Sequence, residues 1–314
     1  MKAGNWIGRN TWVWAVLGSL LLWVLIGLIS GHIALQTVLY NATLASFLVL
    51  LGFGQMTVIT SGDGAIDLTM PYIVTLSAFI STSIMEGGNP YIIPGLLAAL
   101  LVSVAIGCIN GIVITKLRVP PIITTLATGY ITFSGVLVYS RHTPGVPNNV
   151  LSQFVKFQYM GISSLMIISL LLSFIVAVIL YKTPFGKRIH AMGQSSRAAQ
   201  KAGIRTERMT VFIFMFSAFL AGLTGVLLGA YIGGAFMDMG NAYLLTSIAA
   251  VLVGGTLVSG GKSSVAGTLG GALLLTLLVT FLNLTKLTAG YQYIIQGAAL
   301  ILILTASKSR QSAR

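Results

Sequence analysis

Acidic side chains are scarce in this chain of 314 residues, which carries five carboxylates against eighteen lysines and arginines. Only 7% of the residues are charged, whereas 56% are hydrophobic. A water-soluble protein of this length needs far more charge to cover its surface, so water is excluded as the main solvent. The carboxylates are Asp63, Asp67, Glu86, Glu207 and Asp238.

Catalytic and metal-binding patterns are missing as well. The single Cys108 lies in an apolar run, which excludes a disulfide framework and a CxxC metal or redox site. The chain contains no nucleophile elbow, no HExxH motif, no paired catalytic carboxylates and no ATP-binding motif. We therefore expect a protein that is not an enzyme and has no cofactor or metal of its own.

Long apolar runs dominate what is present. A helix needs about 20 apolar residues to cross roughly 30 Å of hydrocarbon, and the sequence reaches this length repeatedly between short polar breaks. This pattern predicts an all-α integral membrane protein, with residues 1–314 as a single transmembrane domain of about ten helices. The first run has no cleavage site of a signal peptide, so we expect it to be retained. The predicted spans are 12–30, 37–60, 66–85, 91–115, 121–140, 162–181, 209–232, 243–259, 264–283 and 290–306.

The cations predict the orientation of these spans. With the N-terminus in the cytoplasm, only Arg141, Lys156 and Lys286 fall outside, so the positive-inside rule places both termini in the cytoplasm. The net charge of +13 does not indicate nucleic acid, because the cations form no basic face, and lipid headgroups are the expected anionic neighbours. The fifteen cations placed inside are Lys2, Arg9, Lys116, Arg118, Lys182, Lys187, Arg188, Arg197, Lys201, Arg205, Arg208, Lys262, Lys308, Arg310 and Arg314.

Two loops are long enough to contact other proteins. The outward loop, at about 141–160, is either a docking site for a solute-delivering partner or a solvated connector. The cytoplasmic loop at about 182–208 contains a short helix over 197–202, with Ser195 or Ser196 as N-cap and Gly203 at its end. This helix either sits in a groove of another protein or lies on anionic lipid.

Polar residues interrupt the apolar runs between the second and third spans. The stretch from Gly54-Gln55 to Asp67 and Thr69 predicts a helix that unwinds and restarts at Asp67 or Thr69. Such a break is either a gate of a transport pathway or a simple helix cap at the membrane surface. Uncharged polar groups of other spans either contact a passing polyol or join helices. These groups are Asn110, Thr124, Thr125 and Thr128, and Gln55 belongs with them.

Ionisable side chains are otherwise almost absent from the predicted spans. Carriers coupled to protons or sodium usually need buried carboxylates or histidines to bind the ion. We therefore expect the energy source to be another polypeptide. The alternative is a secondary carrier or channel that works without an ATPase.

Several segments together resemble the permease subunits of bacterial ATP-binding cassette importers for ribose, xylose, galactose and autoinducer-2. The resemblance spans nearly the whole chain. Its motifs are Gly54-Gln55 with Gly64-Ala65-Ile66-Asp67-Leu68-Thr69, Asn110-Gly111, Val119-Pro120-Pro121-Ile122-Ile123-Thr124-Thr125-Leu126, Thr183-Pro184-Phe185-Gly186, Ala191-Met192-Gly193, Ala198-Ala199, Gly203-Ile204, Ile248-Ala249-Ala250, Gly254-Gly255-Thr256 and Ser259-Gly260-Gly261.

The resemblance implies a multi-pass protein of the bacterial inner membrane that imports a small polar solute, such as a sugar. It implies a coupling helix that contacts an ATP-binding subunit through Arg197, Ala198, Ala199 and Gly203. The partner subunit would bind ATP and magnesium, a second identical or homologous permease chain would complete the pathway, and a periplasmic binding protein would deliver the solute. Arg197 departs from the Glu that the family often has there, which suits one member of an asymmetric pair.

Overall fold

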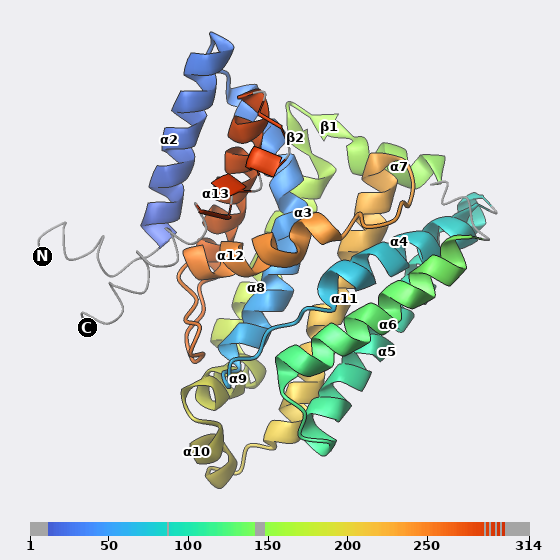
Figure 1. Cartoon of the computed structure of the whole chain (residues 1–314), viewed down its shortest axis with the longest axis vertical. Helices are drawn as coiled ribbons and strands as arrows, with labels where there is room; N and C mark the ends of the chain where they lie inside the picture. Colours follow the sequence, from blue (N-terminus) through green and yellow to red (C-terminus); the bar gives the residue numbers. More distant parts are fainter. Residues whose placement is uncertain are drawn as a thin grey trace, which may run out of the picture.

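The computed structural model describes residues 12–86, 88–141, 148–285, 287–288, 290–292, 294–295 and 297–298. In this part the chain is a bundle of helices with one two-stranded antiparallel hairpin (Figure 1). The helices are α2 Trp12–Ser30, α3 Leu35–Thr60, α4 Met70–Met85, η1 Asn89–Tyr91, α5 Ile92–Lys116, α6 Pro121–Ser140, α7 Asn149–Lys156, α8 Ser164–Lys182, α9 Pro184–Gln194, α10 Ser196–Lys201, α11 Thr206–Ile232, η2 Asn241–Tyr243, α12 Leu244–Val253 and α13 Val265–Leu284. The strands are β1 Gln158–Tyr159 and β2 Ile162–Ser163.

Seven helices of the described residues are long and apolar enough to cross a membrane, and each coincides with a predicted span. The predicted span 66–85 becomes the 16-residue α4, which begins only at Met70. The predicted span 243–259 was too long, because α12 ends at Val253 after 10 residues. A helix of that length rises about 15 Å, half the hydrocarbon thickness. The tenth predicted span, 290–306, lies mostly outside the described residues.

Glycines explain why α12 is short. Gly255 takes a φ of +93°, and a Cβ atom at Gly254 would overlap the backbone of Gly267 in α13. The chain therefore turns away where α12 meets α13, in a conformation that favours glycine. Glycines 254 and 267 are thus in close backbone contact, and the chain turns tightly at Gly260-Gly261, where both φ angles are positive.

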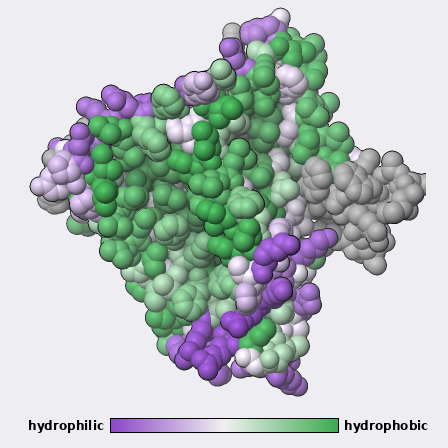
Figure 2. All heavy atoms as spheres, turned by 180° about the vertical axis from the view of Figure 1, so that it is seen from behind, coloured by the Kyte–Doolittle hydropathy of each residue, from purple (hydrophilic) through white to green (hydrophobic). Residues whose placement is uncertain are grey.

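Helices α3 and α11 form the interior of the bundle. In the most apolar stretch of α3, 89% of the residues are buried, and in that of α11 the share is 67%. The corresponding share is 22% for α2 and for the span that contains α5. Many large apolar side chains of α2, α5, α6 and α8 are instead exposed. Figure 2 shows them as a broad apolar surface, with hydrophilic residues gathered toward its edges. This distribution is the one expected of a protein surrounded by lipid.

Small residues bring α5 against α11 in the most extensive helix contact of the described part. Ser103, Gly107 and Gly111 recur every four residues on α5, and so share one face. A Cβ atom at Gly107 would overlap the Phe214 carbonyl oxygen, and one at Gly111 would lie 2.5 Å from the Cα of Val211. The two backbones thus approach as closely as in other membrane helix pairs with small residues at this spacing.

Helix α2 lies at the edge of the bundle, where it packs on α13 (Figure 1). Ala15 of α2 forms a small cluster with Leu274 of α13 and Val253 of α12. A Cβ atom at Gly18 would lie 2.9 Å from the Leu274 Cδ1. The first long helix of the described part is therefore held by α13.

The two ends of the bundle differ in charge. Helices α9 and α10 lie at one end, and α7 with the hairpin lies at the other (Figure 1). The α9–α10 end has an ion pair between Lys116 and Glu207. At the α7 end the contact is between neutral groups, because the Ser152 hydroxyl donates to the Ala230 carbonyl. Most cations of the described residues belong to segments at the α9–α10 end, and Arg141 and Lys156 lie on the α7 side. The described cations are therefore gathered at the α9–α10 end of the bundle.

Candidate functional site

The break between α3 and α4 is an irregular segment whose start is exposed at Asp63 and Gly64 and whose end is buried at Asp67 and Thr69. Three consecutive residues, Gly62, Asp63 and Gly64, take positive φ angles of 88°, 54° and 67°. Thr69 is then the N-cap of α4, with Pro71 in the first turn. The prediction that the helix stops and restarts here is confirmed, with Thr69 rather than Asp67 as the N-cap.

Asp67 fixes this break to α11. Its side chain is 3% exposed, and its Oδ1 accepts hydrogen bonds from the backbone nitrogen of Thr69 at 3.0 Å and from the Thr69 hydroxyl at 2.6 Å. Its Oδ2 accepts one from the Ser217 hydroxyl at 2.7 Å. Because hydrogen bonds to a buried carboxylate are stronger than those between neutral groups, this set gives the break one definite arrangement.

Asn110 extends the network to α5 and α6. Its Nδ2 donates to the Thr69 hydroxyl at 2.7 Å, and its Oδ1 accepts from the Thr128 hydroxyl. The Thr125 hydroxyl lies within hydrogen-bond distance of two carbonyls, that of Pro121 in its own helix at 2.9 Å and that of Ile66 in the break at 3.2 Å. Three helices, α5, α6 and α11, thus converge on the segment 66–69. The sequence singled out Asp67, Asn110 and Thr125 separately, and the structure brings them together.

Gln55 and Thr124 do not join this network. Gln55 is fully buried, and neither atom of its amide has a hydrogen-bond partner among the described residues. The buried Thr124 hydroxyl is also without one there. A buried amide without partners costs free energy, so Gln55 stands out as a group with unused hydrogen-bonding capacity.

Ser217 was not identified from the sequence, although it completes the cage around Asp67. It is the one hydroxyl in the run from Val211 to Leu220, and it is fully buried. A polar residue within such an apolar run was the available signal. Serine is so common in membrane helices that nothing in the sequence linked it to Asp67.

A junction of three glycine-bearing segments joins the start of the break to α9. A Cβ atom at Gly193 of α9 would overlap the Thr60 carbonyl oxygen and the Gly261 nitrogen, and one at Gly260 would lie 2.5 Å from the Cα of Gly62. The Gly261 nitrogen donates to the Thr60 carbonyl at 2.9 Å. We call the contact of Thr60, Gly62, Gly193 and Gly260-Gly261 the glycine junction. It leaves no room for side chains between α9 and the end of α3.

The predicted coupling helix is α10. The Ser195 hydroxyl accepts from the Ala198 nitrogen as N-cap, and Gly203 follows the helix with a φ of +86°. The Gly203 nitrogen donates to the Gln200 carbonyl and the Ile204 nitrogen to the Ala199 carbonyl, which is the Schellman ending. The helix has two faces, because Ala199 is 4% exposed in the main core cluster while Arg197 and Ala198 are exposed.

The loops contain more structure than the sequence predicted. The 182–208 loop has a second helix, α9, which begins after Thr183 as N-cap and buries Ile189 and Met192. The described part of the outward loop forms α7, capped by Asn148, and the hairpin; residues 142–147 lie outside the described part. Both loops therefore contain regular secondary structure in the parts described.

Asp67 is not part of a cluster of metal-binding side chains in the described residues. No group of three or more His, Cys, Asp or Glu in the described residues has a metal-binding arrangement. The carboxylate of Asp67 is occupied by donors from its own chain. These hydrogen bonds hold the backbone break in place between the helices.

Comparison with known proteins places this sequence among permeases. The family model described as branched-chain amino acid transport system, permease component, matches residues 37–304. The chain is 33% identical to the ribose import permease protein of Bacillus subtilis (strain 168), over 84% of this chain and 82% of that protein. It is 31% identical to the autoinducer 2 import system permease protein of Yersinia pestis (strain Pestoides F), over 92% of this chain and 82% of that protein. No solved structure matches it.

Proposed function

Because this chain belongs to the family of branched-chain amino acid transport system permease components, we propose that it is the permease subunit of an ATP-binding cassette importer for a sugar-like solute. The solute class comes from the relatives, whose names give ribose and autoinducer 2. The protein is a multi-pass protein of the bacterial inner membrane. ATP and magnesium are bound by a separate ATP-binding subunit.

The observation that supports this proposal is the connection between α10 and the Asp67 break. Helix α10 follows α9 directly, α9 meets the end of α3 at the glycine junction, and the break begins there. The break then reaches α5, α6 and α11 through Asp67, Thr69 and Asn110. A displacement of α10 by a docked ATPase is thereby transmitted to a polar segment in the interior of the bundle.

Two short helices support a pathway at this place. Each follows one of the two most buried of the seven span-length helices: α4 follows α3, and α12 follows α11. Short or interrupted apolar helices in corresponding positions are typical of solute sites near the middle of the membrane. We propose that Asp67, Asn110 and Thr125 hold the gate, and that Gln55 and Thr124 supply hydrogen bonds to the solute in another state of the gate.

The orientation follows from the cations. We propose ten spans with both termini in the cytoplasm, in which the α9–α10 end faces the ATPase and the α7 end faces the periplasmic binding protein. Arg197 and Ala198 are exposed on α10, and Gly203 ends that helix. A second permease chain, identical or homologous, completes the pathway.

Reconstitution tests this function. The purified chain is placed in liposomes with the ATP-binding subunit and the solute-binding protein of its own transport system, and uptake of labelled ribose is measured with and without ATP. We expect uptake only when ATP is present on the ATPase side. Uptake driven by a proton or sodium gradient without the ATPase would refute the proposal and establish a secondary carrier.

A pair of variants tests the gate separately. Asn110→Leu removes the link between the break and α6, so we expect ATP hydrolysis to continue while uptake falls at least tenfold. Thr115→Val is the control, because the Thr115 hydroxyl bonds only to carbonyls of its own helix, and we expect normal uptake. Equal uptake by both variants would contradict the role of Asn110.

A further inference from the structure

A cationic cavity lies between the exit of α10 and the start of α11. It has a volume of about 460 Å³, and its lining includes Arg188, Arg205 and Arg208, together with Ala202 and Gly203 at the end of α10. Ile204, Met209 and Phe212 supply apolar lining in the same cavity. Neither the gate nor the coupling helix accounts for this combination of three guanidinium groups with apolar side chains.

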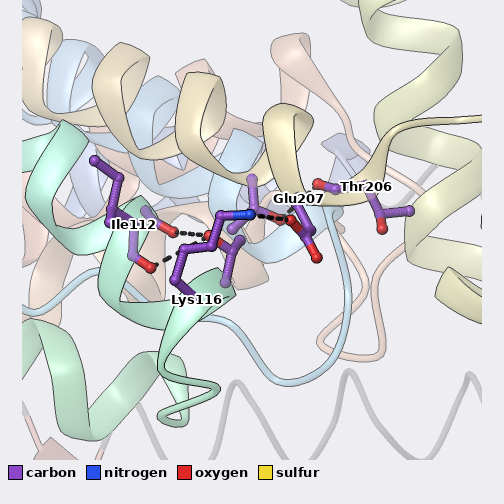
Figure 3. A network of polar contacts seen from close by, with 7 residues as sticks. Ile112, Lys116, Thr206 and Glu207 are labelled. Atoms are coloured by element: carbon purple, nitrogen blue, oxygen red, sulfur yellow. Dashed lines mark hydrogen bonds and ion pairs between the residues drawn. The ribbon is translucent and has the colours of Figure 1, made fainter.

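The positive charge of this cavity is not balanced within the described residues. Glu207 lies between Arg205 and Arg208 in the sequence, but its Oε2 accepts from the Lys116 Nζ of α5 at 2.8 Å (Figure 3). That ion pair is the only one found in the described part of the chain. Since the carboxylate nearest in sequence is engaged elsewhere, the three arginines repel one another unless an external anion joins them.

The cavity also changes from cationic to apolar along one face of α11. Arg205 and Met209 are four residues apart, as are Arg208 and Phe212, so each pair shares a helix face. Met209 is 6% exposed, whereas Phe212 is 55% exposed on a helix long enough to span the membrane. A ligand that matches both parts has an anionic group joined to an apolar chain.

We propose that this cavity binds an anionic phospholipid, with its phosphodiester held by Arg188, Arg205 and Arg208 and an acyl chain along Phe212. Arginine forms bidentate hydrogen bonds with phosphate oxygens, and basic pockets beside membrane helices at the cytoplasmic surface bind such headgroups. A soluble phosphate ester or an acidic protein surface offers the same anion. Both leave Phe212 uncovered, so the exposed apolar wall favours the lipid.

Lipid titration of the purified full-length chain tests the proposal. Dioleoylphosphatidylglycerol, dioleoylphosphatidylcholine and glycerol 3-phosphate are added in turn, and bound molecules are counted by native mass spectrometry. We expect retention of phosphatidylglycerol alone. Each of Arg205→Gln and Arg208→Gln is expected to weaken this binding about fivefold, and the double variant about 30-fold, which corresponds to about 1 kcal/mol for each cation.

Two further variants make the result specific. Arg118→Gln removes one cation at the same end of the bundle but outside the cavity, and we expect unchanged lipid binding. Phe212→Ala is expected to weaken phosphatidylglycerol binding without creating affinity for glycerol 3-phosphate. If the double variant fails to fold, Arg188→Gln replaces it, with the same expected fivefold loss.

Three outcomes overturn the proposal. Equal retention of phosphatidylcholine shows that the headgroup charge is not recognised, and tight binding of glycerol 3-phosphate shows a site for soluble phosphate esters. In the third, the double variant keeps its lipid but loses affinity for the ATP-binding subunit. That result assigns the arginines to an acidic protein surface.

Discussion

Gly193→Ala tests whether the glycine junction is as close as the structure shows. The added Cβ atom would overlap the Thr60 carbonyl oxygen and the Gly261 nitrogen, and lie 2.8 Å from the Gly261 Cα. These are backbone atoms, which cannot rotate away as a side chain does. Overpacking of this kind costs about 1–3 kcal/mol, and losing the hydrogen bond from Gly261 to Thr60 adds about 1 kcal/mol. We expect a destabilisation of about 2–4 kcal/mol.

Gly203→Ala is the matched control in the same loop. A Cβ atom at position 203 would meet nothing within 4 Å, so only the φ of +86° disfavours the alanine. That backbone strain costs about 1–2 kcal/mol. The free energies of unfolding are compared by titration from mild detergent into sodium dodecyl sulfate. The junction argument is wrong if Gly193→Ala is no more destabilising than Gly203→Ala.

Four other substitutions have definite expected outcomes. Ser217→Ala removes a hydrogen bond to the buried Asp67 carboxylate and is expected to cost about 1.5–3 kcal/mol in the same unfolding titration, which an unchanged midpoint would contradict. Gly203→Val strains the end of α10, so ATP hydrolysis in the assembled importer is expected to continue without uptake, whereas normal coupling would indicate that α10 only rests on lipid. Gly107→Leu separates α5 from α11 and is expected to abolish folded protein, measured by size-exclusion chromatography; a monodisperse product would refute the close contact. Glu207→Gln breaks only the exposed pair with Lys116, so its unfolding midpoint is expected to stay unchanged, and a large shift would show that the pair is structural.

The long helices could be predicted from the sequence because hydropathy alone determines them. Apolar length defines α2 and α6 to the residue, as both occupy the predicted ranges 12–30 and 121–140. The same rule failed for α12, since Gly254-Gly255 ends the helix without ending the apolar run. Hydropathy cannot distinguish an apolar helix from an apolar turn packed against another helix.

The candidate site was predictable in its members but not in its connections. Asp67 and Asn110 stood out as polar residues in apolar surroundings, and both take part in the network. Ser217 was missed because its relation to Asp67 spans 150 residues of chain. The glycine junction was missed for a related reason, since contacts between glycines leave no side-chain pattern in the sequence. Long-range partners of this kind follow only from the packing of the helices.

The packing of α2 on α13 has a consequence for biosynthesis. About 235 residues separate the end of α2 from the start of α13, and at about 5–20 residues per second a ribosome needs roughly 10–50 s to make them. During that interval α2 has only lipid and the helices already inserted as neighbours, while α3, α5 and α11 assemble. The family match begins at residue 37, after α2. The order of synthesis thus makes α2 a helix that docks late onto a bundle already formed.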